Sequence, residues 1–328
     1  MLLVYMLGAI LQDNWRMVAI ISTVVPVLSV LAVWLLVPES PVWLTSRRRF
    51  DEAELNMKTV RNLSADDKLP EELQEELEFM ISNKESSQKD GWMDTLRFLK
   101  KPEAYKPLII MNLFIFFQQF SGILVVMMYT VNIVKEIGVQ FDGYLATVMI
   151  GATRFAMSLL ISFASKKYGR RPMCNFSGVG MTFSLTALAT YMNLVHDGVV
   201  ARGQASWVPI SLLVVFILTA TVGFYNLPFA MLGEVFPTRI RGSAVGFTTC
   251  LAAMFCFVSV KIFPNLKDAF EYRNVFTFYA VVCVIGTITM YKYLPETHGK
   301  TLKEIEQAFK GRSRKRSQIR VVGESDIE

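Results

Sequence analysis

Residues 107–134, PLIIMNLFIFFQQFSGILVVMMYTVNIV, form a long apolar stretch without a charged side chain. A helix of about 20 apolar residues is enough to cross a hydrocarbon core about 30 Å thick. The apolar residues here run continuously instead of alternating, which favours a helix over a strand of a membrane barrel. The stretch therefore predicts a transmembrane helix.

Six further stretches have the same character, and Arg154 is the one charged residue inside any of the seven. They cover residues 17–37, 143–165, 172–195, 203–233, 242–260 and 274–291. Hydrophobic residues make up 52% of the chain and charged residues only 19%. The sequence therefore predicts an all-α, multi-pass membrane protein, and this class excludes most soluble enzymes.

The basic residues are distributed unevenly between the two sides of the predicted membrane. If residues 38–106 are cytosolic and the sides alternate from there, 27 Lys and Arg face the cytosol and six face the other side. This asymmetry follows the positive-inside rule and places the C-terminus in the cytosol. The net charge of +6 is then explained by an anionic lipid surface, so the lipid bilayer is an expected partner and nucleic acid is not.

No constellation of residues predicts an enzyme. The two histidines, His196 and His298, lie outside the spans, and no span holds a nucleophile–base pair or a set of metal ligands. We therefore expect no catalytic residue, no metal site and no cofactor. The remaining expected partner is a small-molecule solute.

A short repeat indicates how the spans are grouped. The first complete span ends in Pro38-Glu39-Ser40, and the last span, six helices later, ends in Pro295-Glu296-Thr297. Two related six-helix halves would produce this repeat. Only the end of the first half precedes the repeat, so we expect the sequence to be a piece of a longer protein.

The spans and the repeat predict four parts. They are the partial fifth and complete sixth transmembrane helices (1–37), a cytosolic helical linker (38–106), a six-helix bundle (107–294) and a cytosolic basic tail (295–328). In the linker, amphipathic helices are expected at 48–62, 70–82 and 91–101, packed on the cytosolic mouth of the bundle. The alternative is that this linker is a solvated segment.

Five motifs occur in a fixed order along the chain. They are Pro38-Glu-Ser-Pro41, Gln118-Gln119-Phe-Ser-Gly122, Gly169-Arg170-Arg171, Gly233-Glu234-Val-Phe-Pro237 followed by Arg241-Gly242, and Pro295-Glu-Thr-His-Gly-Lys300. Together they resemble the sugar porters of the major facilitator superfamily. Leu3-Val-Tyr5 and Arg239-Ile-Arg241-Gly-Ser-Ala244 are similar to the insect facilitated trehalose transporter-like branch of these porters.

This resemblance implies a fold and a function. The fold would be a truncated bundle of the major facilitator type, with a six-helix C-terminal half and the last one to two helices of the N-terminal half. The function would be facilitative transport of a sugar or related polyhydroxyl solute by alternating access, in the plasma membrane.

Charged residues at the predicted cytosolic ends of the helices are candidates for a gate. They are the carboxylates Glu39, Glu234 and Glu296 and the guanidiniums Arg170, Arg171 and Arg241. Arginine makes bidentate, charge-assisted bonds to carboxylates, and such bonds would tie neighbouring helix ends together when the mouth closes. The alternative is ordinary solvation of helix ends by charged side chains.

Gln118 and Gln119 lie at the midpoint of the 107–134 span, where polar side chains are costly and usually face a cavity or another helix. Amides both donate and accept hydrogen bonds, as a polyhydroxyl ligand requires. The following Ser121-Gly122 allows local unwinding, which is typical of transporter helices near a midplane site. The alternative for the two amides is helix–helix association.

A second helix break is predicted at 223–229, where Asn226 and Pro228 interrupt an apolar span and Phe229 can face a sugar ring. The resemblance adds Tyr129 as a polar member of the solute site. It also reveals departures from the family pattern, because Leu124, Ala252 and Ala253 stand where amides or an aromatic residue are usual, and Phe229 replaces a tryptophan.

Arg154 replaces another amide of the family pattern and puts a charge in the middle of a span. A charge at this depth is by default a functional-site hypothesis, so we expect Arg154 in the solute site. Two alternatives remain open: an organic-anion transporter that uses Arg154, and a non-transporting pseudo-transporter or sensor. A channel is the least favoured, because gate motifs serve no purpose in a continuous pore.

The charge asymmetry makes a prediction about orientation. An epitope tag placed after Glu328 should react with antibody only after the cells are permeabilised, because the basic tail is expected in the cytosol. Immunofluorescence with and without detergent measures this. Labelling of the tag in intact cells would contradict the predicted orientation.

Overall fold

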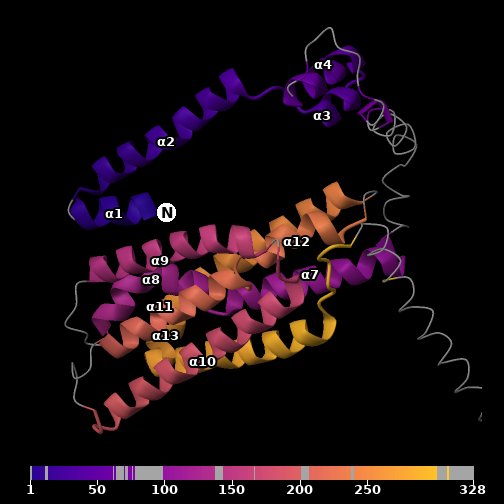
Figure 1. The fold of residues 1–328 in the computed structure, drawn as a ribbon. Coiled ribbons are helices and arrows are strands. Elements are labelled where there is room, and N and C mark those ends of the chain that lie inside the picture. The colour runs from indigo at the N-terminus through magenta and orange to yellow at the C-terminus, as the bar shows by residue number, and fades with distance from the viewer. Residues whose placement is uncertain are drawn as a thin grey trace, which may run out of the picture. The chain divides into compact units, whose positions relative to one another are not determined.

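A computed structural model describes the residues 2–11, 14–61, 63, 70, 73–75, 77, 99–136, 143–165, 167–200, 207–237, 240–300 and 309. Their regular structure is entirely helical (Figure 1). The chain divides into two compact units, one of Met1–Asp13 with Lys100–Glu328 and one of Asn14–Leu99. Each unit is described by itself.

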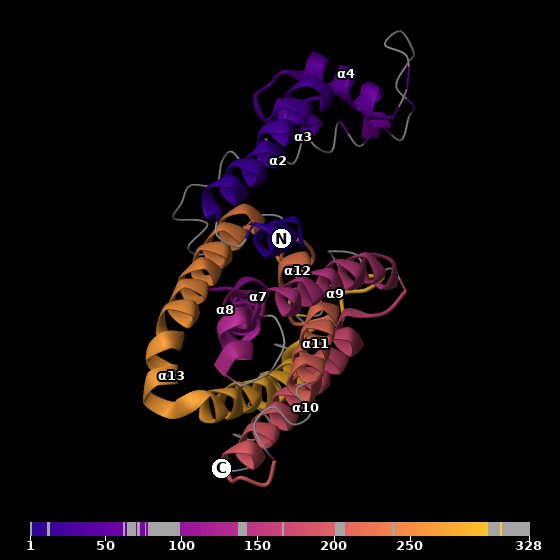
Figure 2. The ribbon, with the colours of Figure 1, turned by 90° about the vertical axis from the view of Figure 1, so that its left-hand side faces the viewer.

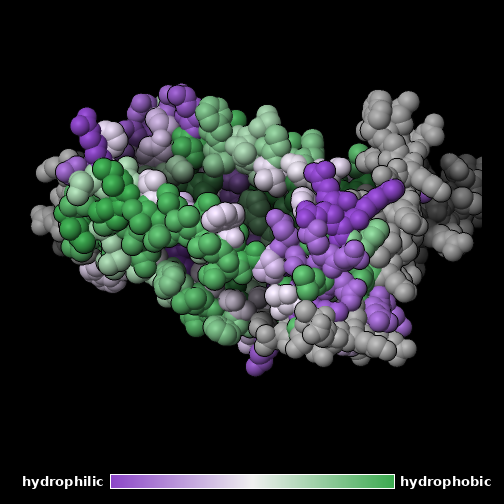
Figure 3. Space-filling model, turned by 90° about the horizontal axis from the view of Figure 1, so that it is seen from above, coloured by the Kyte–Doolittle hydropathy of each residue, from purple (hydrophilic) through white to green (hydrophobic). Residues whose placement is uncertain are grey.

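The Asn14–Leu99 unit contains α2 (Trp15–Leu36), α3 (Pro41–Ser46) and α4 (Phe50–Val60). Asn14 caps α2, since its side chain accepts from the backbone N–H of Met17. The side chains of α2 form a hydrophobic surface, and hydrophilic side chains gather over α3 and α4 (Figure 3). α2 has the length and composition of a transmembrane helix, as predicted for 17–37.

The linker helix predicted at 48–62 is present as α4, and it packs on α3 through a small core of Leu44, Ala53 and Met57. Within the helix predicted at 70–82, residues 73–75 and 77 are helical. The other residues of that helix except Pro70, and residues 91–98 of the third predicted helix, lie outside the described residues. Packing of the linker on the bundle stays a prediction.

The larger unit is a helical bundle. Its helices are α1 (Leu2–Ile10), α7 (Pro102–Phe120), α8 (Ile123–Glu136), α9 (Gly143–Ala164), α10 (Arg170–His196), α11 (Trp207–Val222), α12 (Leu227–Val235) and α13 (Arg241–Tyr293). The short α1 lies along α9, with the ring of Tyr5 against Gly151. α10 packs between α11 and α13, where Gly180 meets Thr219 and Gly178 meets Thr287.

Five helical stretches in the described part of the chain are long and apolar enough to cross a membrane. They are Trp15–Leu36, Pro102–Lys135, Tyr144–Ala164, Trp207–Val235 and Arg241–Tyr293. The predicted span at 172–195 is present as α10 but falls outside this group. The reason is its run of small and hydroxyl residues, such as Ser177 and Ser184, which are buried against neighbouring helices and lower its hydropathy without facing lipid.

The predicted spans 242–260 and 274–291 lie in the two arms of α13, which are separate helices that meet at a kink. The chain reverses direction within α13 at Glu271, whose φ of 59° and ψ of 156° are non-helical (Figure 2). Residues 261–270, between the two predicted spans, are therefore helical despite Pro264. The two predicted spans are separated by residues 261–273, but the non-helical turn between the two arms is confined to Glu271.

Two spans are interrupted near the predicted positions, although residues 227–229 of the break predicted at 223–229 belong to α12. The 107–134 span breaks between α7 and α8, where Gly122 has a φ of 84° that only glycine adopts readily. The 203–233 span breaks at residues 223–226, between α11 and α12. Both breaks expose backbone groups that would normally be paired within a helix.

Side chains supply partners for the second break. The backbone N–H of Phe224 donates to Ser177 Oγ at 3.0 Å, and Asn226 Nδ2 donates to the carbonyl of Thr221 at 2.9 Å. Gly223 lies so close to α10 that an added Cβ would be 2.7 Å from the carbonyl oxygen of Met173. These contacts pair polar groups that would otherwise be costly in a lipid environment.

The close approach at Gly223 can be tested by Gly223→Ala. The new methyl group would collide with backbone of α10, and overpacking of this kind costs about 1–3 kcal/mol. Thermal unfolding of the detergent-solubilised protein should therefore shift to lower temperature. Gly246→Ala is the matched control, because a Cβ at Gly246 has no neighbour within 4 Å. Equal melting temperatures for the two variants would contradict the close approach.

Candidate functional site

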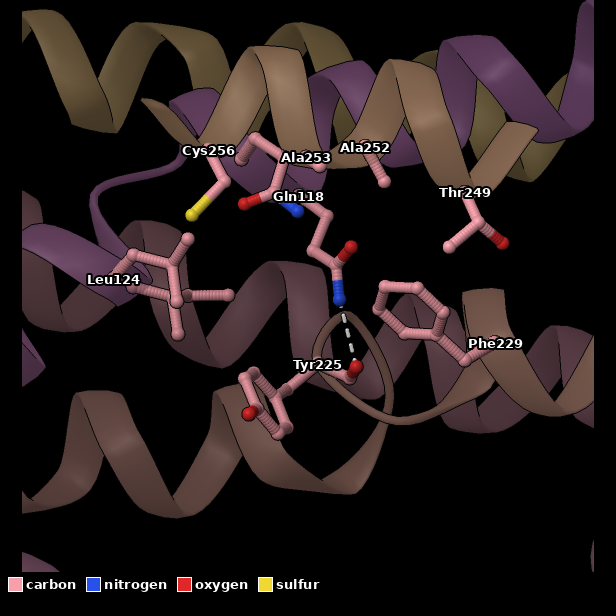
Figure 4. A pocket seen from close by; sticks show the side chains of 10 residues that line it. Gln118, Leu124, Tyr225, Phe229, Thr249, Ala252, Ala253 and Cys256 are labelled. Atoms are coloured by element: carbon pink, nitrogen blue, oxygen red, sulfur yellow. Dashed lines mark hydrogen bonds between the residues drawn. The ribbon is translucent and has the colours of Figure 1, made fainter. Parts of the chain in front are cut away.

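A cavity of about 290 Å³ opens where α7, α8, the α11–α12 break, α12 and α13 meet (Figure 4). The volume is close to the lower end of the range of small-molecule sites. It is lined by Gln118, Gln119, Ile123, Leu124, Tyr225, Phe229, Thr249, Ala252, Ala253 and Cys256. Both predicted glutamines and Phe229 therefore face one space.

The amide of Gln118 has two different environments. Its nitrogen donates to the backbone carbonyl of Tyr225 at 2.7 Å, within the break, while its oxygen lies on the opposite side of the group (Figure 4). That oxygen is buried and has no hydrogen-bond partner among the described residues. The same holds for Oε1 of Gln119. An unpaired buried acceptor costs about 1–3 kcal/mol, so a donor group that reached either oxygen would be favoured.

The contacts of Gln118 bear on both purposes considered from the sequence, and its role in solute binding stays a prediction. Its N–H group joins α7 to the α11–α12 break, as helix–helix association predicts, and its oxygen is left for another donor. Gln119 is tied to α13 through its backbone, because its carbonyl accepts from Ser259 Oγ at 2.8 Å. The backbone contact keeps this part of α7 in place beside the cavity.

Two other predicted site residues do not line this cavity. Asn226 uses its amide nitrogen on the carbonyl of Thr221, at the end of α11. Tyr129 lies at a kink in α8, and its ring packs against Phe263 with 4.8 Å between the ring centroids. Roles in solute binding for Asn226 and Tyr129 stay predictions.

Arg154 lies behind the cavity wall. Its guanidinium is 4.2 Å from the centroid of the Tyr225 ring, and it also donates to the Tyr225 hydroxyl. A second guanidinium nitrogen is 3.0 Å from Sδ of Met127 in α8. Arg154 is not among the residues that line the cavity, whereas Tyr225 is. The charge can therefore act on this cavity through the aromatic ring that it holds.

Thr249 and Cys256 line the cavity but are absent from the predicted site. Both lie on α13, on the same stripe as Ala252 and Ala253. Residues three, four and seven positions apart share one face of a helix, so the spacing from Thr249 to Cys256 was available in the sequence. The signal is weak because neither residue belongs to a motif.

A second cluster joins charged residues at the ends of α10, α12 and α13. Arg170 donates to Glu234 Oε1 at 2.9 Å, and Thr297 Oγ1 donates to Glu234 Oε2 at 2.7 Å. Glu296 accepts from the backbone N–H groups of Arg170 at 2.8 Å and Arg171 at 3.1 Å, at the first turn of α10. A carboxylate is favoured at a helix N-terminus by the unpaired N–H groups and the helix dipole.

The remaining predicted gate residues have other contacts. Arg171 donates through Nε to the backbone carbonyl of Tyr291 at 3.0 Å, and Arg241 donates to the carbonyl of Phe236 at 3.4 Å. Glu39 belongs to the other unit, where its carbonyl accepts from Asn56. The structure therefore brings four predicted gate residues into one cluster, namely Arg170, Arg171, Glu234 and Glu296. Thr297 also belongs to this cluster, although the sequence analysis did not predict it.

Burial of Glu296 acts to raise the pKa of its carboxyl group. Hydrogen bonds from the backbone N–H groups of His298, Arg170 and Arg171 act in the opposite direction, and together with the nearby His298 they hold this pKa below its ordinary value of 4.5. A carboxyl group with a lowered folded-state pKa stabilises the fold above its ordinary pKa. That contribution is lost as the pH falls through the lowered value.

The lowered pKa predicts the behaviour of Glu296→Gln. At neutral pH this variant should unfold at a lower temperature than the unchanged protein, because the charge at the α10 N-terminus is removed. The difference should shrink as the pH falls below 4.5, where the carboxylate becomes protonated. Thermal unfolding across this pH range measures it. Asp197→Asn, at the exposed C-terminal end of α10, is the control, and a difference that does not change with pH would contradict the prediction.

Comparisons with known proteins agree with the helical architecture. The family model for sugar (and other) transporters matches residues 1–309. The facilitated trehalose transporters Tret1 of Drosophila pseudoobscura pseudoobscura and Drosophila willistoni are each 31% identical over 306 residues, 93% of this chain and 34% of each relative. The chain thus spans about a third of the length of these relatives.

Solved structures show the same fold. The proton:xylose symporter XylE bound to 6-bromo-6-deoxy-D-glucose aligns with a TM-score of 0.70 at 23% identity, over 90% of this chain and 59% of that one. The inward-open xylose transporter XylE from E. coli aligns with a TM-score of 0.65 at 23% identity, over 94% of this chain and 62% of that one. At this level of identity the likeness concerns the fold alone.

Proposed function

This chain belongs to the sugar (and other) transporter family, and we propose that it takes part in facilitative transport of a sugar or related polyhydroxyl solute. The observation that carries the proposal is the pair of buried, unpartnered amide oxygens of Gln118 and Gln119 at the cavity. Hydroxyl groups of a solute would donate to these oxygens. The trehalose transporters to which the chain is similar support a solute of this class.

The proposed transport step is alternating access, in which the two sides of the site open in turn. The cluster of Arg170, Glu234 and Glu296 with Thr297 would act as the gate, because it ties α10, α12 and the segment after α13 at one end of the bundle. Several charge-assisted bonds that form or break together make such a contact bistable. The ion pair between Arg170 and Glu234 is partly buried, so it is less screened than a surface pair.

The remaining sequence predictions complete the proposal. The protein is a multi-pass membrane protein; we place it in the plasma membrane with residues 38–106 and the C-terminus in the cytosol. Arg154, Tyr129 and Asn226 are proposed to support the site without lining the cavity. Arg241 and Glu39 are proposed to join the gate in another state of the transport cycle.

The role of the amide oxygens is tested by Gln119→Ala in the protein expressed in oocytes. Uptake of labelled trehalose and glucose should fall about tenfold or more at low solute concentration, because a hydrogen bond to a buried amide is lost. Surface biotinylation should show little change in the amount of protein, since no hydrogen bond of the fold to this oxygen is removed.

Two further variants separate recognition from folding. Gln118→Ala should lower both uptake and the amount of protein, because it also removes the hydrogen bond to Tyr225. Asn112→Ala is the matched control, an amide on the same helix that does not line the cavity. Undiminished uptake by Gln119→Ala would contradict the proposed site.

A further inference from the structure

We propose that Tyr5, which lies on α1 and does not line the cavity, is a positioning residue that holds the ring of Tyr225 in the cavity wall. The connection between the two tyrosines runs through Met127 and Arg154. This inference rests on the proposed function and deepens it, because it adds a residue that sets solute affinity without touching the solute.

The connection begins where α1 is seated on α9. The ring of Tyr5 fills the space of a side chain at Gly151, because a Cβ added there would lie 2.6 Å from Cδ2 of Tyr5. Gly151 and Arg154 are three residues apart and share one face of α9. The hydroxyl of Tyr5 also interacts electrostatically with Arg154 and Tyr225. Tyr5 is therefore close to the charged group that holds the cavity ring.

The Tyr5 hydroxyl also holds one turn of α8. It donates to the backbone carbonyl of Met127 at 3.2 Å, and the side chain of Met127 is buried. Met127 lies two residues before Tyr129, where the backbone of α8 departs from helical geometry with a φ of −108° and a ψ of 15°. Because the donor comes from a different helix, this hydrogen bond fixes the kinked part of α8 relative to α1.

Met127 carries the connection on to Arg154. Its Sδ lies 3.0 Å from one guanidinium nitrogen of Arg154, and the other guanidinium nitrogen donates to the Tyr225 hydroxyl. The guanidinium also lies over the Tyr225 ring, 4.2 Å from the ring centroid. A cation over an aromatic face and a hydrogen bond to the hydroxyl of the same ring together favour one orientation of that ring.

The orientation of Tyr225 matters because this residue lines the cavity (Figure 4). Its carbonyl accepts from Gln118, which fixes the backbone, while Arg154 holds the side chain from outside the lining. Without the hold of Arg154, the ring would be free to turn into the cavity and compete with a solute. The sequence predicts that α1 belongs to the other six-helix half, so a movement between the halves would reach this ring through Tyr5.

Cys256 gives a measurement of the cavity that does not depend on transport. It lines the cavity and is partly accessible, whereas Cys174 and Cys283 are buried. Cys250 is exposed but does not line the cavity, so Cys250→Ser removes a competing thiol. In membranes that contain the Cys250→Ser protein, a maleimide should alkylate Cys256. Glucose or trehalose in the cavity should slow this reaction, and the concentration that halves the rate measures apparent affinity.

Tyr5→Phe removes only the hydroxyl that bonds Met127. The concentration of glucose or trehalose that protects Cys256 should rise about threefold to tenfold, as the loss of one hydrogen bond predicts. Alkylation without any solute should become slower, because the Tyr225 ring then turns toward the cavity. Tyr105→Phe, at an exposed tyrosine of α7, is the matched control and should change neither measurement.

Gly151→Ala tests the seat of Tyr5 on α9. The new methyl group would collide with the Tyr5 ring, so this variant should weaken protection at least as much as Tyr5→Phe does. Gly8→Ala, on α1, is its matched control, because a Cβ at Gly8 has no neighbour within 4 Å.

A double-mutant comparison separates positioning from simple packing. Arg154→Met keeps a long side chain but removes the guanidinium, so the connection from Tyr5 to Tyr225 is already broken in this background. Adding Tyr5→Phe should then change the protecting concentration by less than about twofold. If Tyr5 only packs α1 against the bundle, its substitution should have the same effect with and without the guanidinium.

The outcomes separate the inference from the proposed function. Sugar protection that is unaffected by Tyr5→Phe, or an equal effect of this substitution in both backgrounds, would overturn the inference and leave sugar binding intact. If neither sugar protects Cys256 and Gln119→Ala leaves uptake unchanged, the proposed function itself is wrong. The rate of alkylation without solute then still tests the position of Tyr225, and an unchanged rate in Tyr5→Phe would overturn the positioning role.

Discussion

Backbone groups inside a membrane must find their partners within the protein, and the rest of this structure depends on that constraint. A continuous helix satisfies it automatically, but the α11–α12 break does not. The break is possible because Ser177 bonds the N–H of Phe224, Asn226 bonds the carbonyl of Thr221, and Gln118 bonds the carbonyl of Tyr225. Three polar side chains from two helices and the break itself therefore permit a non-helical segment beside the cavity.

The same constraint explains which parts of the fold could be predicted. Long apolar stretches indicate transmembrane helices from composition alone, and glycine, asparagine and proline mark the breaks at 121–122 and 223–226. The turn at Glu271 could not be found in this way, because residues 261–270 are compatible with a helix and one non-helical residue reverses the chain. The small and hydroxyl residues of α10 lower its hydropathy, but the sequence does not show that they do so because they pack against neighbouring helices.

Residues that were predicted for the site on similar chemical grounds have different contacts in the structure, and their roles in solute binding stay predictions. Two amides in the middle of an apolar helix predicted a cavity, and Gln118 and Gln119 line one. Asn226 is also an amide, but its nitrogen donates to the carbonyl of Thr221 at the end of α11. The partner of Arg154 is an aromatic ring contributed by a residue 71 positions away, and the spacing of the two residues in the sequence carries no sign of this contact.

The two-sided amide of Gln118 has a consequence for how solute and gate communicate. A hydroxyl that donates to its oxygen polarises the amide group and strengthens the bond from its nitrogen to the Tyr225 carbonyl. Tyr225 lies just before α12, a rigid rod of nine residues, about 13 Å long, whose far end carries Glu234. A solute that bound in the cavity would thus act on the residue just before α12, and the ion-paired carboxylate of Glu234 lies at the other end of that helix. Solute recognition and gating would then both depend on α12. A solute too small to reach the Gln118 amide would bind without moving this helix.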